Sequence, residues 1–343
     1  MAKIIAEMSG NHNGSLDSAL AIIDSVAESG AEYLKIQTYT PDTITLPISG
    51  GNFQVSDNHP LWGSKNLYDL YTEAHTPWEW HNRIFQRAKE LGLIAFSTPF
   101  DETAVAFLEE LDVPLYKIAS LEIVDLPLIQ TVASTRKPMI ISTGTARLDE
   151  IAAAVSAARM AGCTDLTLMV CTSSYPARVE DSNLSRMKVL KEVFNVRVGF
   201  SDHTKGINVA LAAVALGADF IEKHVTLNRA DGGVDSNFSA EPDELKRLVI
   251  GAREVSASIG EPHLWGLENE AESIKHRPSL YLSKDVEAGD LISLENVRSV
   301  RPSGGLDPKY IDICIGMRFT KSAPMGTPLG WGLVTDSNER TIH

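Results

Sequence analysis

Short and almost purely apolar runs recur from residue 4 to residue 224 and are separated by longer, mixed stretches. Continuous apolar runs of this length are typical of parallel strands that are buried on both faces. The pattern predicts eight strands, at residues 4–7, 33–37, 94–97, 115–118, 139–142, 166–171, 196–200 and 220–224.

The stretches between these runs have a helical period. Leu16, Leu20, Ile23 and Val26 recur about every 3.6 residues, and Gly30 can end that helix in the left-handed conformation. Residues 76–79 have the composition of a capping box that begins a helix, with a proline at its first position. Residues 150–161 and 243–259 are further amphipathic segments.

Eight strand–helix units in series predict a (β/α)8 (TIM) barrel over residues 1–260. An open, doubly wound sheet is the alternative, but no Gly-x-Gly-x-x-Gly turn follows the first predicted strand. Residues 38–75 are too long for an ordinary connection, so we expect them to be functional or disordered.

The pattern changes after the barrel. Residues 261–276 are polar and predict a linker, and residues 277–343 combine short β-like pieces with frequent glycines. Residues 277–343 therefore predict a small β-rich domain. Because this domain is near the lower size limit for independent stability, we expect it to pack against another protein surface.

Composition narrows the function. A net charge of −14 and an isoelectric point near 5.1 argue against binding to nucleic acid or to an anionic membrane surface. No apolar run approaches the ~20 residues of a membrane helix, and the N-terminus lacks a signal-peptide core. Cys163, Cys171 and Cys314 have no metal-binding or disulfide spacing. We therefore expect a reduced, cytoplasmic protein.

Polar residues gather where the predicted strands end, which is where barrel enzymes keep their chemistry. Two of them are lysines, Lys35 and Lys117, in the company of Thr98, Ser120, Ser142 and Ser201. Lysines among hydroxyl groups suit a phosphate or a carboxylate. The alternatives are ion pairs with a barrel carboxylate such as Glu7 or Glu122, and a Schiff-base lysine of the aldolase type.

Histidines and carboxylates form a second group. His12, His203 and His224 lie at or just beyond strand ends, and the last two follow neighbouring strands. Two imidazoles with hydroxyl and carboxylate neighbours suit Mn, Co or Mg, although a lone histidine is more often a core residue. The carboxylates predicted to act as general acid or base, metal ligand or sugar acceptor are Glu7, Glu122, Glu222 and Asp235.

These segments, in order and at consistent spacing, resemble the sialic acid (nonulosonic acid) synthase family. They are residues 6–7 with 11–14, 35–37, 97–100, 116–120, 142–144, 171–172 with 175–176, 201–204 and 222–224. Residues 35–46, 119–123, 235–239 and 301–310 are most similar to the members that make pseudaminic acid. Val170 and the run Arg277-Pro278-Ser279 depart from the usual family pattern.

The resemblance implies a phosphoenolpyruvate-binding barrel with a small C-terminal antifreeze-like (SAF) domain, and a condensation of phosphoenolpyruvate with 2,4-diacetamido-2,4,6-trideoxy-L-altrose. It implies a homodimer in which one subunit's small domain caps the other's barrel, with Arg301 reaching the sugar. Other roles that it implies are His203 and His224 as ligands of Mn, Co or Mg; Lys35, Thr98, Lys117, Ser120, Ser142, Ser173 and Ser201 on phosphoenolpyruvate; and Glu7, Gln37, Glu122, Tyr175, Glu222 and Asp235 on the sugar and its reacting end.

Three alternatives remain open at this point. A relative could use another acetamido sugar and make N-acetylneuraminate or legionaminic acid. A Schiff-base aldolase would use Lys35 or Lys117 as its nucleophile. A non-catalytic carbohydrate-binding protein would bind through its small domain, and would have no need of a metal pair beside phosphate ligands.

Overall fold

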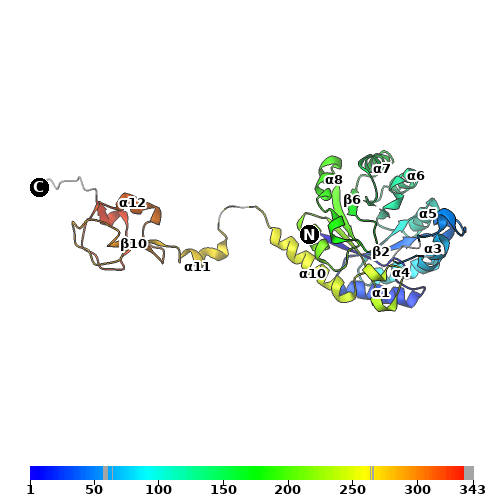
Figure 1. Cartoon of the computed structure of the whole chain (residues 1–343), viewed down its shortest axis with the longest axis horizontal. Coiled ribbons are helices and arrows are strands. Elements are labelled where there is room, and N and C mark those ends of the chain that lie inside the picture. The colour runs from blue at the N-terminus through cyan, green and yellow to red at the C-terminus, as the bar shows by residue number, and fades with distance from the viewer. Residues whose placement is uncertain (57–60, 64, 263, 265, 336–343) are drawn as a thin grey trace. The chain divides into compact units, whose positions relative to one another are not determined.

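The structure, a computed structural model, describes residues 1–343 apart from 57–60, 64, 263, 265 and 336–343, and divides into two units, Met1–Gly260 and Glu261–His343. Among the described residues the first unit holds a closed barrel of eight parallel strands, paired in sequence order with β1 against β8 (Figure 1). The predicted barrel is confirmed. Its strands are β1 Lys3–Glu7, β2 Tyr33–Thr38, β3 Ile94–Pro99, β4 Tyr116–Ile118, β5 Met139–Ser142, β6 Leu166–Cys171, β7 Arg197–Asp202 and β8 Phe220–His224.

A helix follows each strand and covers the outside of the barrel (Figure 1). Ser15 caps the first of these helices by accepting from the backbone N–H of Ser18, and Gly30 ends it at φ 79°, in the left-handed region as predicted. The covering helices are α1 Leu16–Ser29, α4 His81–Glu90, α5 Glu102–Glu110, α6 Leu126–Ser134, α7 Leu148–Met160, α8 Arg186–Phe194, α9 Asn208–Ala215 and α10 Pro242–Ile259.

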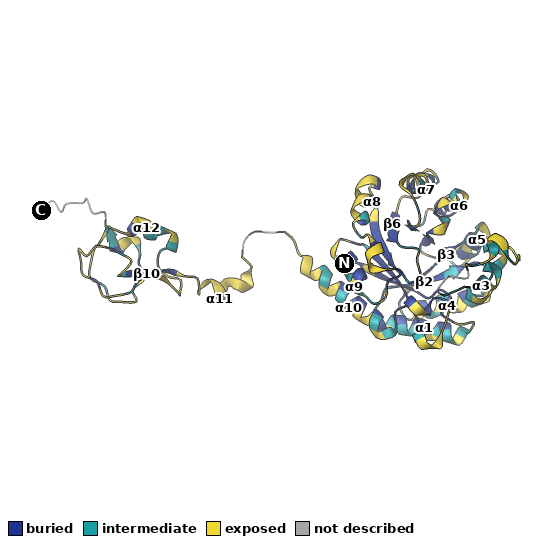
Figure 2. Ribbon diagram, in the orientation of Figure 1, coloured by how far each residue is buried: buried dark blue, intermediate teal, exposed yellow. Residues whose placement is uncertain are grey.

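Two apolar layers hold the barrel together. The larger lies between strands and helices, and the strands are buried along almost their whole length (Figure 2). The smaller fills the barrel interior, with Ile5, Tyr33, Phe96, Leu115, Ile140, Met169 and Phe220. Because side chains two apart on a strand share a face, the next inward residues are Glu7, Lys35, Thr98, Lys117, Ser142, Cys171 and Glu222. An apolar floor thus supports a polar layer one step nearer the carboxyl ends.

The predicted capping box at residues 76–79 is wrong. The segment forms a 3₁₀ turn at Trp78–Trp80, and α4 begins only at His81. Thr76 is fully buried, and its hydroxyl lies 3.5 Å from Nε2 of His12 instead of capping the helix. The hydroxyl is therefore committed to the core.

The long connection between β2 and α4 carries structure of its own. It holds the short helix α2 (Pro41–Ile44) and the helix α3 (Leu67–Ala74), which pack against each other. Part of the connection, residues 57–60 and 64, lies outside the described residues. The described part contains ordered secondary structure, which favours the functional alternative over the disordered one.

The second unit has its own small core, built around Leu280, Val297, Phe319 and Leu329. Residues 261–276, predicted as a linker, include the short helix α11 (Ala271–Ile274). The other elements are β9 Ser279–Leu282, β10 Val297–Val300, α12 Ile311–Cys314, β11 Arg318–Phe319 and β12 Val334–Thr335; β9 pairs with β10, and β11 with β12. In the described part of the chain, no helix has the length and apolarity needed to cross a membrane.

Candidate active site

A cavity of about 370 Å³ lies at the carboxyl ends of the barrel strands. Glu7 and Thr98 are not in its wall but contact Lys35, which is, and Thr98 accepts a hydrogen bond from Lys35 at 3.1 Å. Arg301 belongs to the second unit. The predicted site residues that line the cavity are Lys35, Gln37, Lys117, Ser120, Glu122, Ser142, Tyr175, Ser201, His203, Glu222, His224 and Asp235.

Two lysines and two glutamates form a buried charge cluster on one side of the cavity. Lys35 Nζ lies 2.6 Å from Glu7 Oε2 and 3.5 Å from Glu222 Oε1, and Lys117 Nζ lies 3.6 Å from Glu222 Oε2. Both lysines thus pair with carboxylates, but the partner of Lys117 is Glu222 rather than the expected Glu122. These pairs do not exclude an anion site, because both ammonium groups still face the cavity.

The cluster shifts the protonation equilibria of its members. Burial alone would lower the pKa of Lys35, but Glu222 and Glu7 outweigh it and raise that pKa. Burial lowers the pKa of Lys117 despite the attraction of Glu222. Burial would raise the pKa of Glu222, yet the two lysines lower it to about 2. Lys117 is therefore the cation that the protein compensates least, and it would gain most from an added anion.

Two of the predicted hydroxyl groups lack partners. The Oγ atoms of Ser142, which lines the cavity, and of Ser173, which does not, are buried and make no hydrogen bond. The backbone at Gly144 lies against Ser173 and Ser120, and a Cβ atom there would collide with the Ser173 hydroxyl and lie 2.7 Å from Oγ of Ser120. Buried polar groups without partners are rare in proteins and call for a ligand. Glycine at position 144 lets the backbone approach both hydroxyls closely.

His203 and His224 line the same cavity, and their ring centroids are 5.2 Å apart. His224 lies two residues after Glu222 on β8 and opposite Glu7 of β1 in the strand register. Nδ1 of His203 lies 2.9 Å from the carbonyl oxygen of Thr172, so this nitrogen donates and Nε2 keeps its lone pair. Nδ1 of His224 lies 3.4 Å from Oδ2 of Asp235. Among the described residues, no group of three or more His, Cys, Asp or Glu side chains is arranged to hold a metal ion.

The third predicted histidine has a structural role. His12 is fully buried, its ring packs edge-on against Trp80, and Nδ1 accepts a hydrogen bond from the backbone N–H of Gly14 at 3.1 Å. Burial lowers its pKa to about 4. It does not line the cavity and supports the loop after β1 from within the core.

Glu122 and Tyr175 lie at the rim of the same cavity. Oε2 of Glu122 is buried without a hydrogen-bond partner, and burial raises the pKa of this carboxyl group to about 7. The ring of Tyr175 lies 4.6 Å from that of His203 and 5.6 Å from that of Trp62, between centroids. Glu122 can therefore hold or release a proton near neutral pH.

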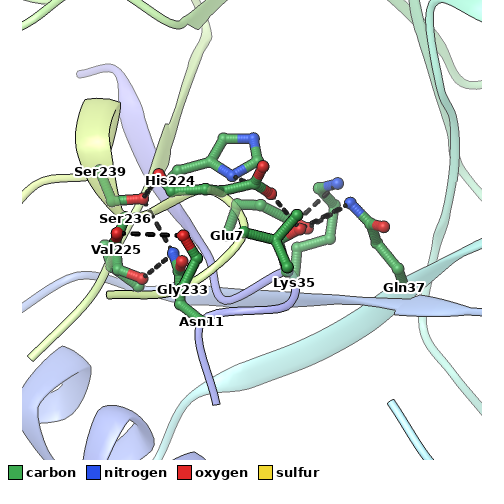
Figure 3. Close-up of polar contacts among 12 residues, drawn as sticks. Glu7, Asn11, Lys35, Gln37, His224, Val225, Gly233, Ser236 and Ser239 are labelled. Atoms are coloured by element: carbon green, nitrogen blue, oxygen red, sulfur yellow. Dashed lines mark hydrogen bonds and ion pairs between the residues drawn. The ribbon is translucent and has the colours of Figure 1, made fainter. Parts of the chain in front are cut away.

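Sequence reasoning missed the residues that hold the loop carrying Asp235. Nδ2 of Asn11 donates to the carbonyl of Val225 and to Oγ of Ser239, both at 2.8 Å (Figure 3). The indole N–H of Trp62 donates to the carbonyl of Val234 at 2.9 Å. Asn11 lies in a segment quoted for the family resemblance, but nothing in its spacing revealed these partners.

The sequence also gave no sign of the cavity's apolar side. Tyr39, Leu70 and Tyr71, from β2 to α3, line it together with Phe100 after β3. Tyr39 packs edge-on against Tyr71 and Phe100, with centroids 5.7 and 5.1 Å apart. The cavity is thus charged on the barrel side and aromatic where the β2–α4 connection covers it.

A (β/α)8 barrel whose strand ends present cations, unpaired hydroxyls and two imidazoles around one cavity defines an enzyme that acts on an anionic substrate. The sequence matches the NeuB family over residues 22–263 and the SAF domain over residues 277–335. The chain belongs to the NeuB family, which confirms the predicted family, and its two parts match the predicted barrel and SAF domain.

Several of its relatives are synthases of pseudaminic, legionaminic or N-acetylneuraminic acid. The chain is 42% identical to a pseudaminic acid synthase of Campylobacter jejuni, over 96% of this chain and 95% of the relative. It is 40% identical to the pseudaminic acid synthase of Helicobacter pylori, over 99% and 98%. The crystal structure of an N-acetylneuraminic acid synthetase from Leptospira borgpetersenii, 34% identical, superposes with a TM-score of 0.71 over 80% of this chain and 90% of that one.

Proposed function

We propose that this enzyme condenses phosphoenolpyruvate with 2,4-diacetamido-2,4,6-trideoxy-L-altrose and water to give pseudaminic acid and phosphate. The observation that carries the proposal is the identity of 42% and 40% with two pseudaminic acid synthases over nearly the full chain. A legionaminic acid synthase of Campylobacter jejuni is 35% identical over 93% of the chain, so the same reaction on another acetamido sugar is the second candidate.

The charge cluster and the hydroxyls bind phosphoenolpyruvate. Lys35 and Lys117 neutralise its phosphate and carboxylate, and Ser142 and Ser173 donate the hydrogen bonds that their hydroxyls do not make in the free protein. Thr98, Ser120 and Ser201 complete this set. Negative charge grows on the phosphate as the C–O bond at C2 breaks, so the same cations stabilise the transition state.

The carboxylates act where the sugar aldehyde and phosphoenolpyruvate react. C3 of phosphoenolpyruvate attacks the aldehyde carbon of the open-chain sugar, and a water molecule then adds at C2. We assign the orientation of that water to Glu7, because its carboxylate lies 2.6 Å from Nζ of Lys35, whose side chain lines the cavity. Gln37, Glu122, Tyr175, Glu222 and Asp235 surround the sugar, and Glu122 can exchange a proton with it near neutral pH.

The two imidazoles fit a divalent cation. Donation from Nδ1 of His203 to Thr172 leaves Nε2 free to coordinate, and Nδ1 of His224 makes no hydrogen bond. Two protein ligands leave several coordination positions for water and substrate, which suits Mn, Co or Mg better than a closed zinc site. When bound, the cation would supply Lewis-acid polarisation of the sugar aldehyde.

We further infer a cytoplasmic homodimer in which the second unit of one subunit completes the barrel site of the other through Arg301. Three free cysteines agree with a reducing compartment. Arg301 is exposed and lines a groove of its own unit together with Arg298. An arginine so presented is free to bind a polar group of a sugar held elsewhere.

The test is phosphate release from phosphoenolpyruvate with a panel of acetamido sugars, with and without added Mn²⁺. The proposal expects the altrose derivative to be used with the highest kcat/KM. A higher value with the sugar precursors of legionaminic acid or N-acetylneuraminate would establish the second candidate instead. Borohydride trapping of a substrate–lysine adduct would replace both with the Schiff-base mechanism.

A further inference from the structure

Ser9 lies two residues after the end of β1 and lines the cavity, with 4% of its surface exposed. Its hydroxyl has two partners: it lies 2.5 Å from Oδ2 of Asp235 and 3.2 Å from Nε2 of Gln37. A carboxylate accepts and an amide NH₂ donates, so the direction of both bonds is settled. The hydroxyl donates to Asp235 and accepts from Gln37.

These bonds belong to a chain of polar contacts among residues of β1, β2 and β8 and the loops that follow β1 and β8. Nε2 of Gln37 also donates to Oε1 of Glu7 at 3.1 Å (Figure 3). Oδ2 of Asp235 lies 3.4 Å from Nδ1 of His224. Ser9 connects the two halves of this chain of contacts, because its hydroxyl bonds to both Gln37 and Asp235. One half ends at the charge cluster beside Lys35, and the other ends at the imidazoles.

The backbone of Ser9 has a conformation that is unusual for a residue with a side chain. Its φ is +47°, in the left-handed region that favours glycine. A serine here carries a conformational cost that glycine would avoid. Such residues gather at functional sites, where the side chain compensates for the strain.

We propose that Ser9 is a positioning residue for the sugar: its hydroxyl fixes the Asp235 carboxylate in the orientation that receives the reacting end. This inference rests on the proposed function. The nearby bonds of Asn11 hold the backbone of the loop after β8, but they do not reach the Asp235 carboxylate. Ser9 acts on the carboxylate itself.

The test is Ser9→Gly, which removes the hydroxyl and relieves the backbone. A hydrogen bond to a charged group is worth about 10- to 150-fold in binding, so kcat/KM for the sugar should fall by roughly that factor. The KM for phosphoenolpyruvate should stay unchanged, and the urea midpoint should stay equal or rise. Asn195→Gly is the matched control, because Asn195 has φ +48° at the exposed end of α8, before β7 and away from the cavity. It should leave both KM values unchanged.

A double-mutant cycle with Asp235→Ala identifies the path of the effect. If Ser9 acts through Asp235, Ser9→Gly should lose most of its effect on kcat/KM in that background. The same fold-loss in both backgrounds would overturn the inference, as would full activity of Ser9→Gly or a lowered urea midpoint with equal losses for both substrates. A wild-type enzyme that releases no phosphate with any sugar would overturn the proposed function, and the inference with it.

Discussion

Lys117→Met and Lys35→Met should have different consequences, although both lysines face the same cavity. At 3.6 Å, the Lys117–Glu222 attraction is about 4–5 kcal/mol at an effective dielectric constant of 20. Burial offsets it, since the pKa of Lys117 is lowered, so this pair adds little to stability. Glu222 keeps Lys35 when Lys117 is removed. Removing Lys35 instead leaves Glu7 without its partner at 2.6 Å, which costs about 3–5 kcal/mol.

Substrate binding reverses this order of importance. A charge-assisted contact with phosphoenolpyruvate is worth about 1.5–3 kcal/mol, so Lys117→Met should raise its KM about 10- to 150-fold. The KM for the sugar should change much less. Urea unfolding and steady-state phosphate release measure the two effects separately. A Lys117→Met enzyme that saturates normally with phosphoenolpyruvate, or that unfolds as readily as Lys35→Met, would refute the reasoning.

Three other outcomes are expected. The pKa of Glu122 is raised from 4.5 to about 7, so its contribution to the free energy of unfolding, up to ~3 kcal/mol, is complete below pH 4.5 and is lost as the pH rises to about 7. Glu122→Gln should remove this pH dependence from urea midpoints measured between pH 4 and 8. Chelation should abolish activity and Mn, Co or Mg should restore it, whereas full turnover after verified metal removal would contradict a Lewis-acid role. Arg301→Ala and Lys117→Ala subunits, mixed at substrate concentrations where each variant alone turns over poorly, should restore up to about a quarter of wild-type activity, because about half of the random dimers are mixed and each has one intact site. No recovery after exchange verified by native mass spectrometry would place Arg301 outside the partner's site.

The sequence predicted the barrel well because its strands are buried on both faces and therefore stay apolar over their length. Two strands run two residues beyond their predicted ends: β3 continues to Pro99 and β7 to Asp202. A charged residue can end a buried strand here because Oδ2 of Asp202 pairs with Nζ of Lys223 on β8 at 2.9 Å. That partner lies 21 residues away and becomes visible only when the strands are side by side.

The positions of the site residues could be predicted, but not their pairings. A strand end is a local feature, so Lys117 and Glu222 could both be found from the sequence. Their pairing depends on barrel closure, which brings side chains from separate strands into one interior layer. Ser9 lay beyond prediction for another reason. Its left-handed φ and its bond to Asp235 leave no periodic signal in the chain.

The cavity has two walls of different origin, and this division bears on how such an enzyme can change its substrate. The charged wall is made by inward residues of the strands, whose positions the closure of the barrel dictates. The aromatic wall comes largely from the β2–α4 connection, which contributes Tyr39, Leu70 and Tyr71. This connection begins after Thr38, where β2 ends, and is not part of the barrel sheet. Insertions or exchanges in that connection can alter the shape offered to a sugar without moving the lysines. Under the proposed function, the part of the site that binds phosphoenolpyruvate can then stay unchanged while the part that selects the sugar diversifies.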